Sequence, residues 1–312
     1  MLNNIGDIVK NNIKQHTLWS NVYGLARSLM AFSLLMTLVV NDVEILFKPI
    51  AGIIEYPNCS RTNFFSLFCL VGANYTQLNI IKWLCILLLF LVVIGWRPRI
   101  TGIFHWIVAF SVHSSAVSLD GGEQVNAVFS LLLLPITLTD NRKWHWQKGV
   151  SANFETKSNS VKSIIAYFSY IALRVQASII YLQAPIAKVK TEDWLNGTAI
   201  YYFFEDGMLG TPDFLKPFLN PILESSLVVI PTWGTLIVQI LLFLGLFAPK
   251  KYWKYLFVLG ILLHTFIALI IGLYSFSLIM FGVLILYLVP FENTKYIKNN
   301  ILIRKLQTVG YK

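Results

Sequence analysis

The chain has 312 residues, of which 56% are hydrophobic and 13% are charged, and its formal net charge is +10. Soluble globular proteins have nearer a quarter of their residues charged, so this composition excludes an ordinary soluble enzyme. The positive charge would suit a nucleic-acid partner, but the Lys and Arg residues gather in one set of loops. That distribution is how polytopic membrane proteins set their orientation, so we expect a lipid bilayer partner and no nucleic acid.

Apolar runs recur along the chain, and a helix of about 20 apolar residues spans roughly 30 Å of hydrocarbon. The runs do not alternate with period two, which argues against a transmembrane barrel. We predict an all-α polytopic integral membrane protein with about eight transmembrane helices, at residues 21–40, 79–96, 100–118, 124–139, 162–187, 227–247, 252–271 and 274–291.

The loops between these spans fall into a basic set and an acidic set. The basic set contains most of the 25 Lys and Arg residues, and the acidic set, chiefly 41–78 and 188–226, contains few of them. Because basic loops stay in the cytosol, both termini are expected there. The transmembrane domain 21–291 then lies between a basic amphipathic cytosolic N-terminus, 1–20, and a basic cytosolic tail, 292–312.

Three further expectations concern loops and cysteines. The basic linker 140–161 is polar, and we expect it to be mobile. Cys59 and Cys69 share a loop on the expected extracytoplasmic side, where oxidation is permitted, so they are disulfide candidates. Cys85 lies in a span and is expected to be a small apolar residue. The loop 188–226 is expected to hold short interfacial helices.

Polar residues within the fifth span indicate a site, because polar groups are expensive inside a bilayer. Arg174, Tyr181 and Lys188 follow at seven-residue spacing and share one helix face, and Gln176 lies on another. Arg174 is expected near mid-bilayer, holding an anionic or polar group. Arg27, in the first span, is nearer the cytosolic end and is expected to snorkel to it.

Two histidines from other spans are expected at a similar depth, about 10 Å below the outer surface. They are His113 and His264, and the turn with Asp120 and Gln124 follows His113 closely. A base, orienting groups and adjustable loops are what an active site needs. Lys188, His113 and His264 are therefore candidate catalytic residues, and the candidate substrate-binding residues are Arg174, Gln176, Tyr181, Trp194, Asp120 and Gln124.

Simpler roles stand beside this interpretation. A boundary lysine more often anchors a helix in the membrane, and an intramembrane histidine more often joins two helices. The chain has no HxxxH or CxxC spacing, so no metal site is predicted. It also lacks GxSxG, Walker and GxGxxG motifs, which leaves these common catalytic classes without support.

Four stretches resemble the HTTM family, the membrane part of the vitamin K-dependent gamma-carboxylase superfamily. They are SNVYGLARSLMAF, HSSAVSLDGGEQV, RVQASIIYLQAPIAKVKTEDWLNGTAIYY and HTFIALIIGLYSFSLIM. Within that superfamily the chain is similar to SdpB-like membrane proteins of bacterial sporulation-delaying toxin operons. The resemblance places Lys188 at the carboxylase base that acts on a reduced quinone, and likens His264, Gly272 and Phe276 to the carboxylase histidine–glycine motif.

The resemblance implies a multi-pass protein of the bacterial plasma membrane that matures or exports a secreted antimicrobial peptide. Its implied partners are a small SdpA-like protein and an SdpC-like toxin precursor, and its implied cofactor is a reduced quinone. The lumenal domain of the carboxylases is missing, and their paired lysines reduce to Ala187–Lys188, which argues against glutamate carboxylation. A non-catalytic scaffold and a toxin-binding or immunity protein remain alternatives, and a transporter is least favoured because no repeat is visible.

Overall fold

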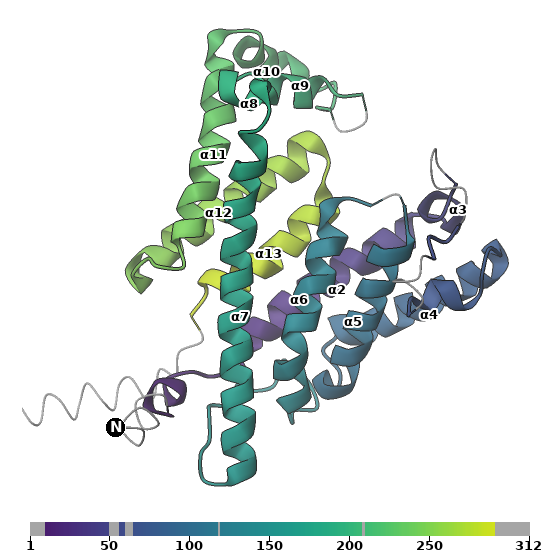
Figure 1. Ribbon diagram of the computed structural model, residues 1–312, viewed down its shortest axis with the longest axis vertical. Coiled ribbons are helices and arrows are strands. Elements are labelled where there is room, and N and C mark those ends of the chain that lie inside the picture. Colours follow the sequence, from purple (N-terminus) through teal and green to yellow (C-terminus); the bar gives the residue numbers. More distant parts are fainter. Residues whose placement is uncertain (1–9, 50–55, 60–64, 118, 208–209, 291–312) are drawn as a thin grey trace, which may run out of the picture.

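The computed structural model describes residues 10–49, 56–59, 65–117, 119–207 and 210–290, and the tail 292–312 lies outside this range. Within it, one helix corresponds to each predicted span (Figure 1). These helices are α2 (Asn21–Val40), α4 (Tyr75–Val93), α5 (Pro98–Ser115), α6 (Gly121–Thr139), α7 (Lys157–Lys188), α11 (Val229–Leu244), α12 (Lys250–Ile271) and α13 (Tyr274–Leu288).

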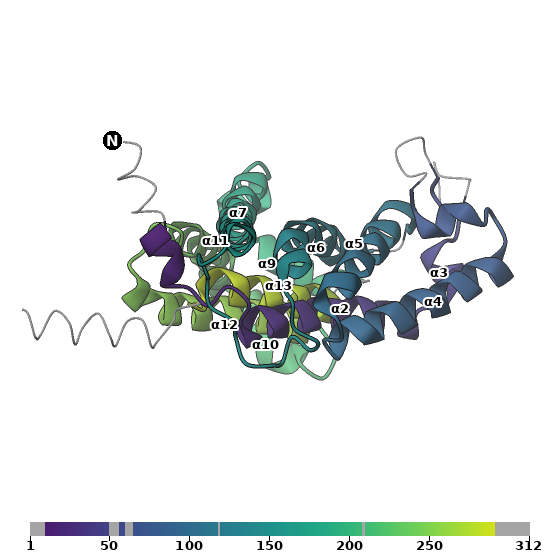
Figure 2. The same ribbon diagram turned by 90° about the horizontal axis from the view of Figure 1, so that it is seen from below.

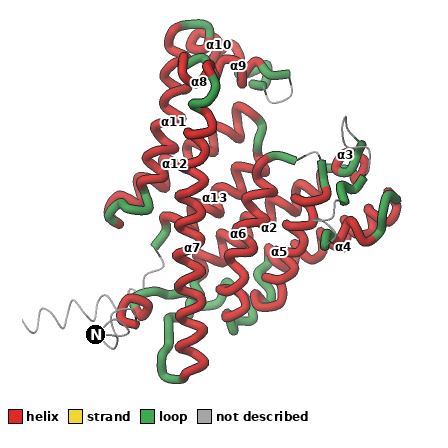
Figure 3. The backbone as a smooth tube through the Cα atoms, viewed as in Figure 1, coloured by secondary structure: helices red, strands yellow, loops and turns green. Residues whose placement is uncertain are grey.

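Six helical segments are long and apolar enough to cross a membrane, counted over the described residues. They are α2, α4, α6, α7, α12 and Ser226–Leu244, which contains α11; α13 is apolar but shorter. No strand occurs in the described part of the chain (Figure 3), which has only two isolated bridges, Trp19 with Val150 and Trp96 with Trp144. The protein is therefore an all-α polytopic membrane protein.

Several helices begin earlier than hydropathy predicts, because polar residues cap them outside the apolar run. Asn74 accepts hydrogen bonds from the first backbone N–H groups of α4, Asp120 caps α6, and Thr156 caps α7. Such caps satisfy donors that a helix leaves unpaired at its N-terminus. Hydropathy marks the segment that suits hydrocarbon, whereas these caps mark the helix end, and α7 consequently extends to 32 residues.

The eight long helices form two layers of four. One layer has the order α5, α6, α7 and α11, and the other has the order α4, α2, α13 and α12 (Figure 2). The layers meet where α13 packs on α6 and α7, where α4 packs on α5, and where α11 packs on α12. Small residues allow the closest approaches: a Cβ at Gly282 of α13 would lie 2.7 Å from Met30 of α2.

Adjacent long helices alternate in direction, so their connections lie at two opposite ends. We call the end with linkers 94–97, 140–156 and 245–249 the basic face, and the opposite end the acidic face. The short helices of the acidic face are α3 (Val43–Leu46), η1 (Leu67–Leu70), α8 (Glu192–Asn196), α9 (Ala199–Glu205), α10 (Lys216–Leu223) and η2 (Ser226–Val228). The loop after α7 thus contains the short helices expected of it, which cover the ends of α11 and α12 (Figure 1).

The linker 140–156 is held in place rather than mobile, contrary to the expectation from its polarity. Arg142 Nη2 lies 2.8 Å from Asp140 Oδ2, and both side chains are buried. The same guanidinium donates to the carbonyl oxygens of His145 and Gln147, each at 2.9 Å. This buried ion pair fixes the start of the linker, while Lys143 and Lys148 stay exposed, which a count of polar residues does not reveal.

Arg27 does not snorkel, and its side chain is fully buried between α2 and α5. Its Nη2 donates to Thr101 Oγ1 at 2.8 Å, while Nε and Nη1 have no hydrogen-bond partner among the described residues. The buried neighbours Tyr23 and Asp140 form a hydrogen bond close by. Helix packing covers Arg27 before its side chain reaches the basic face, so the expectation of a solvated head group is wrong.

His145 fills a space that two glycines leave open, and this generates the first prediction. A Cβ at Gly95, whose φ is +82°, would lie 2.3 Å from the His145 ring. Gly95→Ala combines a left-handed backbone, costing about 1–2 kcal/mol, with overpacking, costing about 1–3 kcal/mol. We expect a loss of at least ~2 kcal/mol in the free energy of unfolding, measured by denaturant titration in detergent.

Gly72→Ala is the matched control, because φ there is +66° but nothing lies within 4 Å of the added Cβ. It should show the backbone cost alone. Equal losses for Gly72→Ala and Gly95→Ala would contradict the packing of His145 against Gly95.

The second prediction concerns pH. Burial, followed by the charges of Arg27 and Arg142, lowers the pKa of His145 to about 3. A histidine in the unfolded chain has a pKa of about 6.5. Below that pH the unfolded chain therefore binds a proton at His145, whereas His145 in the folded chain stays neutral. The stabilising effect of neutral His145 is complete above pH 6.5 and is lost progressively as the pH falls toward 3. The melting temperature of the wild type should decline between pH 7 and 5, and that of His145→Gln should decline less steeply. Identical slopes for the two proteins would refute this role of His145.

Candidate functional site

The centre of the candidate site is a hydrogen bond between α7 and α12. Tyr181 Oη lies 3.0 Å from His264 Nε2, and both side chains are buried. The ring of Phe276, near the start of α13, packs edge-on against the His264 ring at 5.4 Å. His264 Nδ1 is also buried and has no hydrogen-bond partner among the described residues.

Lys188 is the last residue of α7. It lies on the same face of the helix as Tyr181, about 10 Å further along the helix axis. Its Nζ is 3.4 Å from Gln239 Oε1 of α11 and 5.3 Å from the centroid of the Trp194 ring of α8. Trp233 of α11 fixes α8 in turn, because its Nε1 donates to Trp194 O at 3.1 Å. Lys188 is half-buried and forms no ion pair within the described part of the chain.

Two carboxyl groups at the start of α6 extend this site across the acidic face. Asp120 accepts hydrogen bonds from the backbone N–H of Gly122 at 2.7 Å and of Phe276 at 3.2 Å. Glu123 Oε1 accepts from the hydroxyls of Thr37 at 3.3 Å and Ser275 at 3.2 Å. Glu123 Oε2 is buried and has no partner among the described residues.

We call Asp120, Glu123, Tyr181, Lys188 and His264 the polar layer. Phe276 connects its two halves, because the backbone N–H of Phe276 bonds Asp120 while its ring contacts His264. The layer draws on three long helices, α6, α7 and α12, and its carboxyl groups are held by α2 and α13. His264 Nδ1 and Glu123 Oε2 are thus buried atoms on two helices linked through Phe276, without hydrogen-bond partners among the described residues, and such atoms are candidates for binding a ligand.

His113 is not brought to the polar layer. It is half-buried near the acidic-face end of α5, a helix that packs against α4, α6 and η1 rather than α7 or α12. The sequence predicts how deep His113 lies along its helix, but it does not predict which helices are neighbours within a layer. Gln124 is exposed on α6 and Gln176 is half-buried on α7, and neither has a hydrogen bond to the other candidate residues. Trp194 and Asp120 do lie at the site.

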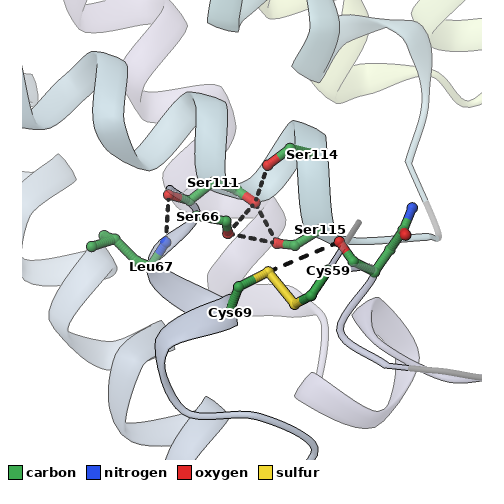
Figure 4. The surroundings of a disulfide bond; sticks show 8 residues. Cys59, Ser66, Leu67, Cys69, Ser111, Ser114 and Ser115 are labelled. Atoms are coloured by element: carbon green, nitrogen blue, oxygen red, sulfur yellow. Dashed lines mark hydrogen bonds between the residues drawn. A yellow bond between two sulfur atoms is a disulfide. The ribbon is translucent and has the colours of Figure 1, made fainter. Parts of the chain in front are cut away.

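A disulfide bond joins Cys59 and Cys69 on the acidic face, near Ser111 and Ser115 at the end of α5 (Figure 4), with the Cα atoms 5.7 Å apart. Ser66 Oγ donates to Ser111 O at 3.2 Å, and Ser111 Oγ accepts from the backbone N–H of Leu67 at 3.0 Å. These bonds tie the described residues around Ser66 to the end of α5.

Arg174 lies near the basic-face ends of α12 and α13, not near mid-bilayer. Its Nε donates to Tyr287 O, one residue from the end of α13, at 3.0 Å. Its guanidinium carbon is 4.1 Å from the ring centroid of Trp253, in the first turn of α12. The estimate of its depth is wrong because α7 is longer than a membrane span and overshoots its neighbours at the basic end.

Sequence reasoning missed three residues that bond to the polar layer, Gln239, Thr37 and Ser275, and it placed Glu123 at this depth without assigning it a role. Glu123 was assigned to a turn, whereas α6 begins at Gly121 and buries it. Gln239 offered a signal, because a glutamine within the apolar run VIPTWGTLIVQILLFL is costly unless paired. The hydroxyls offered no signal, since serine and threonine are ordinary in membrane helices.

An apolar cavity of about 540 Å³ lies between α11 and α12, beneath α9 and α10. Val238 and Leu263 line it, and each directly precedes a residue of the site, Gln239 and His264. Thr235 contributes the hydroxyl of an otherwise apolar wall. The cavity suits a hydrocarbon chain. Among the described residues, no three His, Cys, Asp or Glu side chains lie close enough together to hold a metal ion.

The Tyr181–His264 bond generates the third prediction. Tyr181→Phe removes one hydroxyl and leaves His264 Nε2 unpaired in a buried position, which costs about 1–3 kcal/mol of unfolding free energy. Tyr202→Phe is the control, because Tyr202 is 57% exposed and should change stability by less than about 0.5 kcal/mol. Unfolding titrations in mixed micelles measure both variants, and equal effects would show that the bond contributes nothing.

The sequence of the chain is similar to those of two proteins of Bacillus subtilis. It is 49% identical over 276 residues to the uncharacterized protein YitO of Bacillus subtilis, covering 88% of this chain and 87% of that protein. It is 40% identical over 274 residues to the sporulation-delaying protein SdpB of Bacillus subtilis, covering 88% of this chain and 83% of SdpB. No family model and no solved structure matches, so the HTTM resemblance stays a prediction. At this identity and coverage, the chain belongs to the family of SdpB.

Proposed function

We propose that this chain is a membrane component of the maturation or export of a secreted, sporulation-delaying-type peptide toxin. Its kinship with SdpB supports a role in such a toxin pathway. The polar layer supports a site at the acidic face, which we infer from the charge of the loops to lie outside the cell. We infer a multi-pass protein of the bacterial plasma membrane with both termini cytosolic. A disulfide on the acidic face suits that orientation.

The single observation that carries this proposal is the environment of Lys188. The amine is half-buried, contacts a neutral amide and an aromatic ring, and has no carboxylate counter-charge among the described residues. A lysine so placed has no counter-charge to stabilise its protonated form, so its neutral amine can accept a proton from a bound substrate. Tyr181, on the same face of α7, positions His264, whose Nδ1 can accept or donate a hydrogen bond.

These contacts suggest a role for each residue of the site. Lys188 takes a proton from the substrate, and His264 orients the reacting group. Glu123, with one buried oxygen unpaired, binds a donor on the substrate. The α8–α10 segment covers the site, and Trp194 shields Lys188 from solvent. The chain contributes a site of low polarity in which proton transfer and hydrogen bonding are strengthened.

A reduced quinone fits the cavity between α11 and α12, because its apolar lining suits an isoprenoid tail and its edge reaches the residues next to Gln239 and His264. When bound, a reduced quinone would supply an ionisable hydroxyl and two electrons. Lys188 would hold the proton of that hydroxyl, and the apolar walls would exclude water. The proposed protein partners are a small SdpA-like protein and an SdpC-like precursor, from which the mature peptide is made.

A non-catalytic scaffold is the second candidate, and the surface of the α8–α10 segment favours it. Four large apolar side chains on this segment are between 56% and 77% exposed: Leu195, Tyr202, Phe214 and Phe218. Exposed apolar side chains gathered in this way are typical of a protein-binding surface. Such a surface would recruit a partner or the precursor while another protein performs the cleavage. A toxin-binding or immunity protein would use the same surface and would need no reactive lysine.

The fourth prediction separates these candidates. In cells that make the precursor, Lys188→Ala should lower secreted mature peptide at least tenfold and leave precursor accumulating, as measured by mass spectrometry at matched membrane levels. Lys190→Ala is the control, because Lys190 is exposed two residues further on and should not change the yield.

Full yield from Lys188→Ala would reject the catalytic proposal. The scaffold proposal would then predict that the paired substitutions Phe214→Ser and Phe218→Ser abolish the mature peptide.

A further inference from the structure

A second cavity, of about 280 Å³, lies at the basic face. The segment before α2, the middle of α7 and the first turn of α12 enclose it. Its lining includes Gln15, His16, Tyr170, Arg174, Lys250 and Trp253. Arg174 and Lys188 are separated on α7 by roughly 20 Å of helical rise, so this cavity is distinct from the polar layer.

Arg174 has more hydrogen-bond donors than the described residues satisfy. A guanidinium carries five N–H groups in a fixed plane. Nε is the one nitrogen of Arg174 with an acceptor among the described residues, Tyr287 O at 3.0 Å. Nη2 is buried and has no partner there. The ring of Trp253, 4.1 Å from the guanidinium carbon, fixes the plane in which the remaining donors point. The protein thus presents an oriented guanidinium with unused donors.

The charge of the cavity indicates the sign of its ligand. Arg174 and Lys250 both line it, His16 lies beside them, and the described residues of the lining include no Asp or Glu. The lining is therefore positive, and an anion is the complementary occupant. Planar, bidentate recognition by arginine suits oxyanions such as phosphate and carboxylate.

The position of the cavity indicates where that anion comes from. Lys250 begins α12, and Tyr287 lies one residue before the end of α13, so the cavity is level with the ends of two apolar helices. In a bilayer this level is the headgroup region of the leaflet on the basic face. Tyr170 and Trp253 add the aromatic rings that settle at that depth.

We propose that the Arg174 cavity binds the phosphate of an anionic phospholipid headgroup in the cytosolic leaflet. Arg174 donates to the phosphate oxygens, Lys250 adds a second positive charge, and the acyl chains lie along the exposed apolar side of α12. This site is separate from toxin chemistry, and it removes Arg174 from the residues that bind the peptide substrate. It anchors the first turn of α12 against α7 through a lipid.

The fifth prediction tests this site with the full-length protein purified in neutral detergent. Phosphatidylglycerol, added to the micelles, should raise the melting temperature saturably, whereas diacylglycerol, which lacks phosphate, should not. Arg174→Gln should raise the half-saturating phosphatidylglycerol concentration about tenfold, in line with the loss of a charge-assisted bond. Lys148→Gln is the control, because Lys148 is an exposed basic-face lysine outside the cavity and should change that concentration less than twofold.

Lys250→Gln provides a second variant that keeps the Arg174–Trp253 packing, and it should raise the half-saturating concentration in the same direction. Inorganic phosphate is tested separately: if it also stabilises the wild type but not Arg174→Gln, the site takes phosphate from a soluble source as well. Equal half-saturation for wild type, Arg174→Gln and Lys250→Gln would overturn the proposal, as would equal stabilisation by diacylglycerol and phosphatidylglycerol.

Discussion

Polar groups inside a bilayer must find partners within the protein, and that constraint organises this fold. The Tyr181–His264 bond joins α7 to α12, and Lys188 joins α7 to α11 through Gln239. Arg174 joins α7 to α13. Since lipid offers no hydrogen bonds, each contact favours one arrangement of helices over the alternatives. The long helix α7 is the element through which these contacts pass.

The same constraint separates structural polar groups from functional ones. Arg142 uses its donors on Asp140 and three backbone carbonyls, so it has nothing left to offer a ligand. His264 and Glu123 each keep a buried atom without a partner in the described part of the chain, and an apolar cavity adjoins their layer. Unsatisfied buried atoms are uncommon in folded proteins. Where several buried atoms without hydrogen-bond partners lie close together on different helices, a bound ligand would supply the missing partners.

The fold and part of the site were predictable from the sequence because hydropathy and charge act locally. Residues 21–40 were assigned to a span with the bounds that α2 has, and Tyr181 and Lys188 share one face of α7 as their spacing implied. His264 and Asp120 join the site from other helices as the sequence analysis expected, but other residues of the site were not predictable. His113 failed to join because depth says nothing of lateral order, and Arg174 was misplaced because α7 overshoots the bilayer. Gln239 and Glu123 came into place only through helix packing.

The proposed role in toxin maturation requires the acidic face to lie outside the cell, where a secreted peptide is met. Substituted-cysteine labelling tests this most directly, in a background with Cys85 replaced by Ala. In intact cells, a membrane-impermeant maleimide should label Glu192→Cys, on the acidic face, whereas Lys148→Cys, on the basic face, should react only after permeabilisation. The reverse pattern would put the polar layer in the cytosol and contradict the account.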